Sequence, residues 1–214
     1  MPNDTINHYE KACAEWRRKF IEMDHQLLLE QLPEIKQEDE YLTLRHFGRK
    51  YGIHTETGRI ISPEDFQPVD VNKQLNIYTL LWYASPHAIL QNKWVPFREL
   101  KGASPFTSAF EKHVLTPFAR TFSGQPEKLM MACEALGGIR LPNSDAGCQI
   151  NAFDCIPVQY LFWDHDDEFP AEGNILFDNS ATDFIHVERT VSIAVEGILT
   201  LAEAAGIETK GPMF

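Results

Sequence analysis

The first thirty residues place their apolar side chains at alternating spacings of three and four, which is the spacing of one helical face. The positions on this face are Ile6, Tyr9, Cys13, Trp16, Phe20, Met23 and Leu27. Pro33 follows, and proline cannot continue a helix because it lacks the backbone N–H. The pattern predicts one helix that packs on the rest of the chain, while the same spacing also suits a dimer seam.

The period of the apolar positions changes near residue 40. Between residues 40 and 62, short β-rich runs alternate with glycines, which predicts a small antiparallel meander. Leu75 to Tyr83 is strongly apolar and predicts a buried helix that ends at Pro86. Trp94 to Phe97 is a short β-rich run, for which we expect a loop or an edge strand.

The rest of the chain predicts more helices, then strands, then a last helix. Helices are expected from Ser104 with a kink at Pro117, from Pro126 to Gly137, and from Val187 to a cap at Gly206. Strands are expected at Ile150–Phe153, Ile156–Trp163 and Asn174–Phe177. The sequence therefore predicts a single α+β domain over residues 1–214. It would have an antiparallel sheet from both ends of the chain, an inserted helical segment at 72–137, and N- and C-terminal helices.

The net charge of the chain limits the kinds of partner that it can bind. The chain has 31 acidic and 19 basic residues, a net charge of -12. This acidity argues against a nucleic-acid binder and against docking on anionic membranes. The chain has no apolar run of the roughly 20 residues needed to span a bilayer. Met1 to Thr5 lacks the basic and apolar regions of a signal peptide. We expect a cytoplasmic protein with neither nucleic acid nor membrane as a partner.

The acidity is concentrated in one stretch. Between Arg140 and Arg189 there is no lysine or arginine, and the ten acids there are Asp145, Asp154, Asp164, Asp166, Asp167, Glu168, Glu172, Asp178, Asp183 and Glu188. The density peaks in Trp163–Pro170. Such crowded carboxylates repel one another unless they are solvated, partly protonated, or paired with a cation or a basic partner. This segment is therefore the candidate functional site.

The segment suggests two kinds of site. A divalent cation is a candidate cofactor, because oxygen ligands suit Mg²⁺, Ca²⁺ or Mn²⁺ and histidines favour a transition metal. The candidate metal ligands are Asp164, Asp166, Glu168, Asp178, His165 and His186. The candidate residues for a small-molecule ligand are Asp164, Asp167, Glu168, Asp178 and Arg98. If the flanking strands pair as a hairpin, Asp178 lies at the end opposite the loop; otherwise the two acidic groups converge.

Other interpretations of the acidic segment remain open. It is equally consistent with a solvated turn whose acids pair structurally with Arg45, Arg98 or Arg189. Glu168 and Asp178 would be the acid and base of an enzyme, a weaker hypothesis because paired acids arise easily in an acidic protein. Motifs of nucleotide cradles and of the serine nucleophile elbow do not occur.

The four cysteines, Cys13, Cys133, Cys148 and Cys155, are scattered and form no Cys-x-x-Cys. The spacing therefore encodes neither a zinc knuckle nor an iron–sulfur cluster. We expect all four to be reduced and free of metal. Cys148 and Cys155 also suit an approach across adjacent strands, as a redox pair or a shared metal site.

Several segments resemble a bacterial and archaeal family known as domain of unknown function 3786. They are Tyr41–Tyr51, Trp94–Leu100 with Gly102, Trp163–Pro170 and Ile175–Asp178. The resemblance runs from about residue 35 to 200. It implies an anaerobe-associated cytosolic protein, with a redox-accessory arrangement in relatives that carry an iron–sulfur domain ahead of this module. The present N-terminus has a single cysteine, so no cluster is expected in this chain. The resemblance implies no activity.

These observations leave three functional hypotheses. The first is a ligand- or metal-binding domain with a carboxylate-rich site, accessory to anaerobic redox or cofactor metabolism. The second is a protein-interaction module whose acidic face docks a basic partner. The third is an enzyme that uses paired carboxylates. The sequence names neither a substrate nor an oligomeric state.

Overall fold

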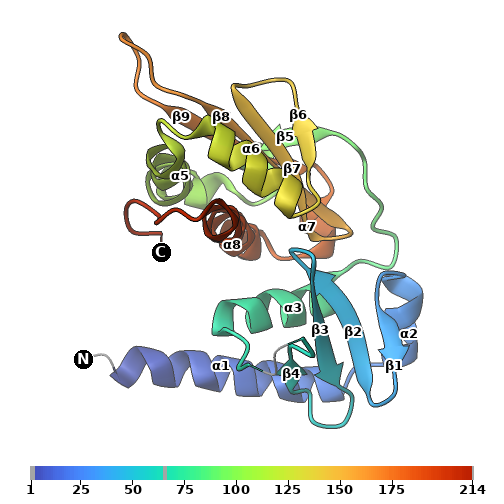
Figure 1. The fold of residues 1–214 in the computed structure, drawn as a ribbon. Coiled ribbons are helices and arrows are strands. Elements are labelled where there is room, and N and C mark those ends of the chain that lie inside the picture. Colours follow the sequence, from blue (N-terminus) through green and yellow to red (C-terminus); the bar gives the residue numbers. More distant parts are fainter. Residues whose placement is uncertain (1–2, 65–66, 214) are drawn as a thin grey trace.

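A computed structural model describes residues 3–64 and 67–213 of the chain. It confirms the α+β class and shows the chain arranged in two halves, one above the other in Figure 1. The N-terminal half contains α1 (Asn3–Ile21), α2 (His25–Gln31), β1 (Lys36–Glu38), β2 (Tyr41–His46), β3 (Arg49–His54), β4 (Ile60–Ile61) and α3 (Val71–Tyr83). The predicted meander and the predicted buried helix both lie in this half, and both are confirmed.

The predicted N-terminal helix is two helices. Asp24 interrupts it, because its side chain accepts hydrogen bonds from the backbone N–H groups of Gln26 and Leu27 and so caps α2. Because of this break, the predicted apolar face does not continue from α1 into α2. Leu27, which was expected on that face, is 47% exposed. Phe20 is buried, and the Trp16 ring lies edge-on to Trp82 of α3 at 6.0 Å. The side chains of Ile6 and Tyr9 lie outside the described part.

The C-terminal half contains the second sheet and most of the helices. Its elements are β5 (Trp94–Pro96), α4 (Thr107–Phe110), a π-helical turn (Glu111–Leu115), α5 (Thr116–Phe122), α6 (Pro126–Ala135), β6 (Ile139–Leu141), β7 (Ala146–Phe153), β8 (Ile156–Trp163), β9 (Glu172–Asp178), α7 (Ala181–Phe184) and α8 (Val187–Ala205). Two single 3₁₀ turns, Phe97–Glu99 and Ser104–Phe106, follow β5. The kink expected at Pro117 takes the form of the π-helical turn, in which the Thr116 N–H donates to the Glu111 carbonyl.

The strands from the two ends of the chain form two sheets, whereas we expected one. The first sheet has the order β1-β2-β3-β4 and the second has the order β5-β9-β8-β7-β6, with antiparallel pairing throughout. The separation has a packing cause, because α3 and α8 pack against each other where the halves join (Figure 1). β5 is an edge strand, one of the two forms expected, and β6 was not predicted.

The turn between β2 and β3 reaches across to the second sheet. Phe47 and Gly48 both have positive φ, 47° and 77°, as a tight hairpin turn requires. The Phe47 N–H donates to the carbonyl of Ala152 in β7 at 2.9 Å.

At the far end of the C-terminal half, Gly206 caps α8 in the left-handed conformation, as predicted. No helix in the described part is long and apolar enough to cross a membrane.

Candidate functional site

The acidic segment is the tip of a hairpin. β8 and β9 pair from Val158↔Phe177 to Trp163↔Glu172, so residues 164–171 form the connection. Asp178 pairs with Trp94 at the opposite end of β9. Figure 1 shows this hairpin as an orange arm that projects beyond the helices. The tip and Asp178 therefore do not converge, and the structure adopts the hairpin alternative.

Two of the tip carboxylates are occupied by local hydrogen bonds. Asp164 accepts from the backbone N–H of Gly124 at 2.8 Å and from that of His165 at 2.9 Å. Its partial burial raises its pKa, but these bonds and His165 outweigh that effect and lower it. Asp166 accepts from the N–H groups of Glu168 and Phe169, which lower its pKa. The carboxylates of Asp167 and Glu168 are exposed.

Asp178 is buried and has a structural role. Its carboxylate accepts from the backbone N–H groups of Gln91 at 3.0 Å, Lys93 at 3.2 Å and Ser180 at 3.0 Å. Burial raises the pKa of Asp178, and the bonds from Ser180, Gln91 and Lys93 together lower it below its ordinary value. The side chain thus fixes the loop before β5 and the turn after β9.

The basic residues and histidine predicted to join the acidic segment lie away from its tip. Arg98 is exposed in the turn after β5. His186 is also exposed, and its Nδ1 lies 3.7 Å from Oε2 of Glu188. The Arg45 guanidinium donates to the Gly48 carbonyl at 2.7 Å. Within residues 3–64 and 67–213, no ion pair joins the acidic tip to Arg45, Arg98 or Arg189. That same part of the chain holds no group of three or more His, Cys, Asp or Glu side chains placed to bind a metal ion.

The expectation of four reduced cysteines is wrong. Cys133 and Cys148 form a disulfide, because the last turn of α6 packs over β7 and brings their Cα atoms to 5.8 Å. Cys13 and Cys155 are free and buried. Cys148 therefore pairs with α6 and not with Cys155.

Cys155 instead donates to a carboxyl group. Its Sγ lies 3.3 Å from Oε1 of Glu34, and burial raises the pKa of Cys155 well above its ordinary value. Burial also raises the pKa of Glu34, to about 7; the bond from Cys155 opposes this rise and the nearby Asp154 adds to it. A thiol with a raised pKa is a poor nucleophile, so this pair does not suggest covalent catalysis.

A buried polar network occupies the junction of the two halves. His46 of β2 is 1% exposed, and Glu196 in the middle of α8 is 6% exposed. Nε2 of His46 lies 3.0 Å from Oε2 of Glu196, and the buried Asn76 amide of α3 donates to the same oxygen at 3.1 Å. The Lys73 ammonium, also on α3, lies 3.2 Å from Oε1 of Glu196. Three side chains, from β2 and α3, thus meet the Glu196 carboxylate of α8.

The hydrogen bonds place one proton of the network. Nδ1 of His46 lies 2.7 Å from the Ala152 carbonyl, which only accepts, so Nδ1 carries a proton. Burial raises the pKa of Glu196, but the hydrogen bonds and charges of His46 and Lys73 together lower it below its ordinary value. Glu196 is therefore a carboxylate, and its Oε2 faces both Nε2 of His46 and the Asn76 amide.

The surrounding packing holds the network in place. The His46 ring stacks on Phe153 with the centroids 4.3 Å apart. Next to Glu196, a Cβ on Gly197 would overlap the Tyr160 hydroxyl, so only glycine allows β8 to approach α8 this closely. The Tyr160 hydroxyl donates to the Ala194 carbonyl of α8 at 3.3 Å. These contacts leave Glu196 little freedom to move.

A groove of about 630 Å³ runs along α8 and is lined by both Glu196 and Lys73. Asp70, Asn72 and Lys73, at the start of α3, line it with polar groups, and α8 adds Glu188, Arg189, Ser192, Thr200 and Glu203. Its apolar lining comes from Phe106, Ala109, Val191, Val195, Leu199 and Met213. Oε1 of Glu196 is buried, and its partner among the described residues is the Lys73 ammonium at 3.2 Å.

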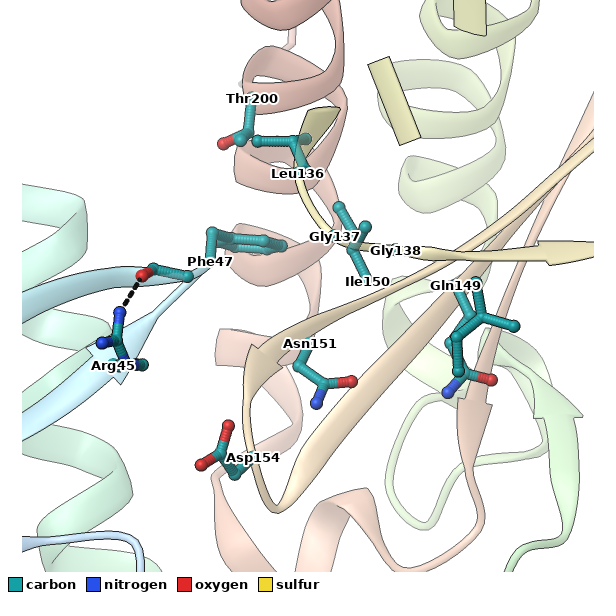
Figure 2. Close-up of a pocket in the computed structure, with 12 residues that line it drawn as sticks. Arg45, Phe47, Leu136, Gly137, Gly138, Gln149, Ile150, Asn151, Asp154 and Thr200 are labelled. Carbon is teal, nitrogen blue, oxygen red and sulfur yellow. Dashed lines mark hydrogen bonds between the residues drawn. The ribbon is translucent and has the colours of Figure 1, made fainter. Parts of the chain in front are cut away.

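A second hollow, of about 200 Å³, lies between the β2–β3 turn and the α6–β6 turn. Figure 2 shows Phe47 on one side of it and Gly137 and Gly138 on the other, with the Arg45 hydrogen bond to Gly48 dashed. Thr200 lines both hollows. The smaller one is below the usual size of a ligand site and has no buried ion pair in its wall. The α8 groove is therefore the better candidate.

The sequence interpretation missed this network. Its members are separated by 120 residues between Asn76 and Glu196 and by 150 between His46 and Glu196. Glu196 lies opposite the predicted apolar face of its helix, where a charged residue is expected, so its local sequence gives no signal of burial. Contacts with His46 of β2 and Asn76 of α3 bury it in the folded chain.

Comparison with known proteins adds one finding. The model of the family described as Domain of unknown function (DUF3786) matches residues 28–199. No curated protein and no solved structure gives a significant match. The match includes all the strands, His46, Lys73, Asn76 and Glu196. The chain therefore belongs to the DUF3786 family.

Proposed function

We propose that the chain is a small-molecule-binding domain and that its ligand occupies the α8 groove. The observation that carries this proposal is the Lys73–Glu196 ion pair, whose carboxylate is buried and whose two members both line the groove. A buried carboxylate is costly to desolvate, and a ligand that donates to it would offset part of that cost. Buried ionisable groups of this kind are typical of functional sites.

The size and lining of the groove support the same function. A volume of about 630 Å³ lies within the usual range for small-molecule sites. Such sites combine a mainly apolar lining with a few polar groups that orient the ligand. The groove is lined by residues of α3 and α8, which pack against each other where the two halves of the chain meet, and ligand sites often occupy such junctions.

A fragment screen by ligand-observed NMR tests this proposal. Leu199 lines the groove and is 45% exposed, so Leu199→Trp should fill the groove without disturbing the core. Leu90 is 36% exposed and does not line the groove, so Leu90→Trp is the matched control. We expect fragments that bind the wild type and Leu90→Trp but not Leu199→Trp. Fragments that bind all three proteins equally would contradict the proposal.

A second candidate function concerns the acidic arm. Asp167, Glu168 and Phe169 are exposed at the projecting tip of the β8–β9 hairpin (Figure 1). We propose, as the alternative, that this tip docks a basic protein. Association of this kind is steered by charge and weakens as salt rises. A pull-down from lysate at low and high salt tests this alternative, with Asp167→Asn/Glu168→Gln as the control bait. Specific capture is a protein that the wild type retains at low salt and that the control bait does not retain.

We also propose a small molecule as the ligand, rather than nucleic acid or a membrane, and the net charge of -12 supports this choice of partner. A cytoplasmic location is part of the proposal. An accessory role in anaerobic metabolism is part of the same proposal. Growth of a deletion strain with and without oxygen tests it, because a defect confined to aerobic growth would contradict it.

A further inference from the structure

We infer that the ligand of the α8 groove carries a hydrogen-bond donor and an acceptor side by side at one end and an apolar group at the other. Apolar α-amino acids are the simplest molecules of this class. The inference rests on the proposed function, since it takes the groove as the binding site. It goes further by naming the chemistry that the groove recognises.

The polar requirement follows from two atoms. Oε2 of Glu196 is used by His46 and Asn76, and Oε1 is paired with the Lys73 ammonium at 3.2 Å. The ammonium carries three donors, so it can serve a ligand as well as Oε1. Lys73 is 37% exposed on a flexible stem, so it can turn toward a ligand. A ligand that donates to Glu196 and accepts from Lys73 satisfies both groups at once.

The charges favour a zwitterion over a simple ion. Lys73 and Glu196 are adjacent and opposite in charge, and Asp70, Glu188, Glu203 and Arg189 also line the groove. A simple anion would meet the Glu196 carboxylate and the other acids, and a simple cation would meet the Lys73 ammonium and Arg189. An amino acid places its carboxylate on Lys73 and its ammonium on Glu196. Each charge then faces its opposite.

The apolar requirement follows from the rest of the groove. Val195 lies one residue before Glu196, and Leu199 lies three residues after it, on the next turn of α8. Phe106 and Met213 add apolar surface from two other segments. An aliphatic or aromatic side chain beside the charged pair would bury apolar surface here, which favours binding in proportion to its area.

Isothermal titration calorimetry with three matched probes tests the inference. The probes are leucine, 4-methylpentanoic acid, which lacks the amine of leucine, and 3-methylbutylamine, which lacks its carboxylate. We expect leucine to bind, and each partial probe to bind at least about tenfold more weakly, the effect of one lost hydrogen bond between charged groups. Lys73→Met should weaken leucine binding similarly. Lys128→Met, an exposed lysine on α6, should not.

The outcomes separate this inference from the proposed function. If the acid or the amine binds as tightly as leucine, the paired recognition is contradicted and the groove remains a binding site. If none of the three binds while screened fragments still compete at the groove, the ligand class is wrong and the proposed function stands. If no fragment binds at the groove either, both are wrong.

Discussion

Nε2 of His46 lies 3.0 Å from Oε2 of Glu196, although the two residues are 150 positions apart in the chain. His46 belongs to the first sheet and Glu196 to the last helix, so this contact joins the two halves of the fold. Both groups are buried, and each has further hydrogen-bond partners. Breaking a buried polar pair of this kind by removing one member is destabilising.

Removing one member of the pair should therefore destabilise the fold. Glu196→Gln leaves the Lys73 ammonium without its counter-charge and Nε2 of His46 without a carboxylate, and we expect a loss of about 3 kcal/mol in the free energy of unfolding. His46→Gln should cost a similar amount. The double variant should lose less than the sum of the two, because the two side chains contact each other. Urea denaturation of all four proteins measures this coupling, and additive losses would contradict the contact.

The Glu34 carboxyl should make stability depend on pH near neutrality. Its pKa is raised from 4.5 to about 7 in the folded state, so the folded chain holds a proton that the unfolded chain releases. Its contribution to stability is therefore complete below about pH 4.5 and decreases as the pH rises to about 7. Glu34→Gln should remove this decrease, and the exposed Glu30→Gln should retain it. Thermal unfolding between pH 4.5 and 8 is the measurement; identical slopes in all three proteins would be evidence against a shifted pKa.

Gly197 should tolerate no side chain. A Cβ there would overlap the hydroxyl of Tyr160, which is fully buried and cannot move aside. We expect Gly197→Ala to cost about 1–3 kcal/mol of stability, the usual range for overpacking. Tyr160→Phe removes the clashing oxygen, so the double variant should recover part of the loss. A Gly197→Ala protein as stable as the wild type would show that α8 does not lie this close to β8.

The acidic tip should contribute little to stability. Asp167 and Glu168 are exposed, so Asp167→Asn/Glu168→Gln should change the free energy of unfolding by no more than about 0.5 kcal/mol. Asp166→Ala should be worse, because Asp166 accepts two backbone hydrogen bonds in the turn. Melting temperatures of the three proteins with EDTA and with Mg²⁺ or Mn²⁺ test this. A wild type stabilised by either cation, with the effect lost in the double variant, would restore the metal-site hypothesis.

Local patterns were enough to predict most elements of the fold. The spacings near α3, α6 and α8 and the β-rich runs of β8 and β9 correspond to the observed helices and strands. The break at Asp24 was missed because a helix cap inside an apolar period leaves the period nearly unchanged. The division into two sheets was missed because strand partners are set by packing across the chain, which periodicity does not record.

The candidate site was predicted less well, for a related reason. Charge density drew attention to Asp164–Glu168, where the acids are crowded because the tip is exposed to solvent. The groups that carry the present proposal are single side chains from distant segments, Lys73, His46 and Glu196. Each is ordinary in its local sequence. Only the folded chain brings them to one carboxylate.

Backbone amide NMR during titration with leucine tests the central claim most directly, because it locates the ligand as well as detecting it. We predict saturable shifts at Lys73, Val195, Glu196 and Leu199 in the groove, and their loss in Leu199→Trp. If leucine proves not to bind, the best fragment from the screen takes its place. Saturable shifts confined to the acidic tip at 164–169, or to the hollow beside Gly137, would contradict the assignment of the ligand site to the α8 groove.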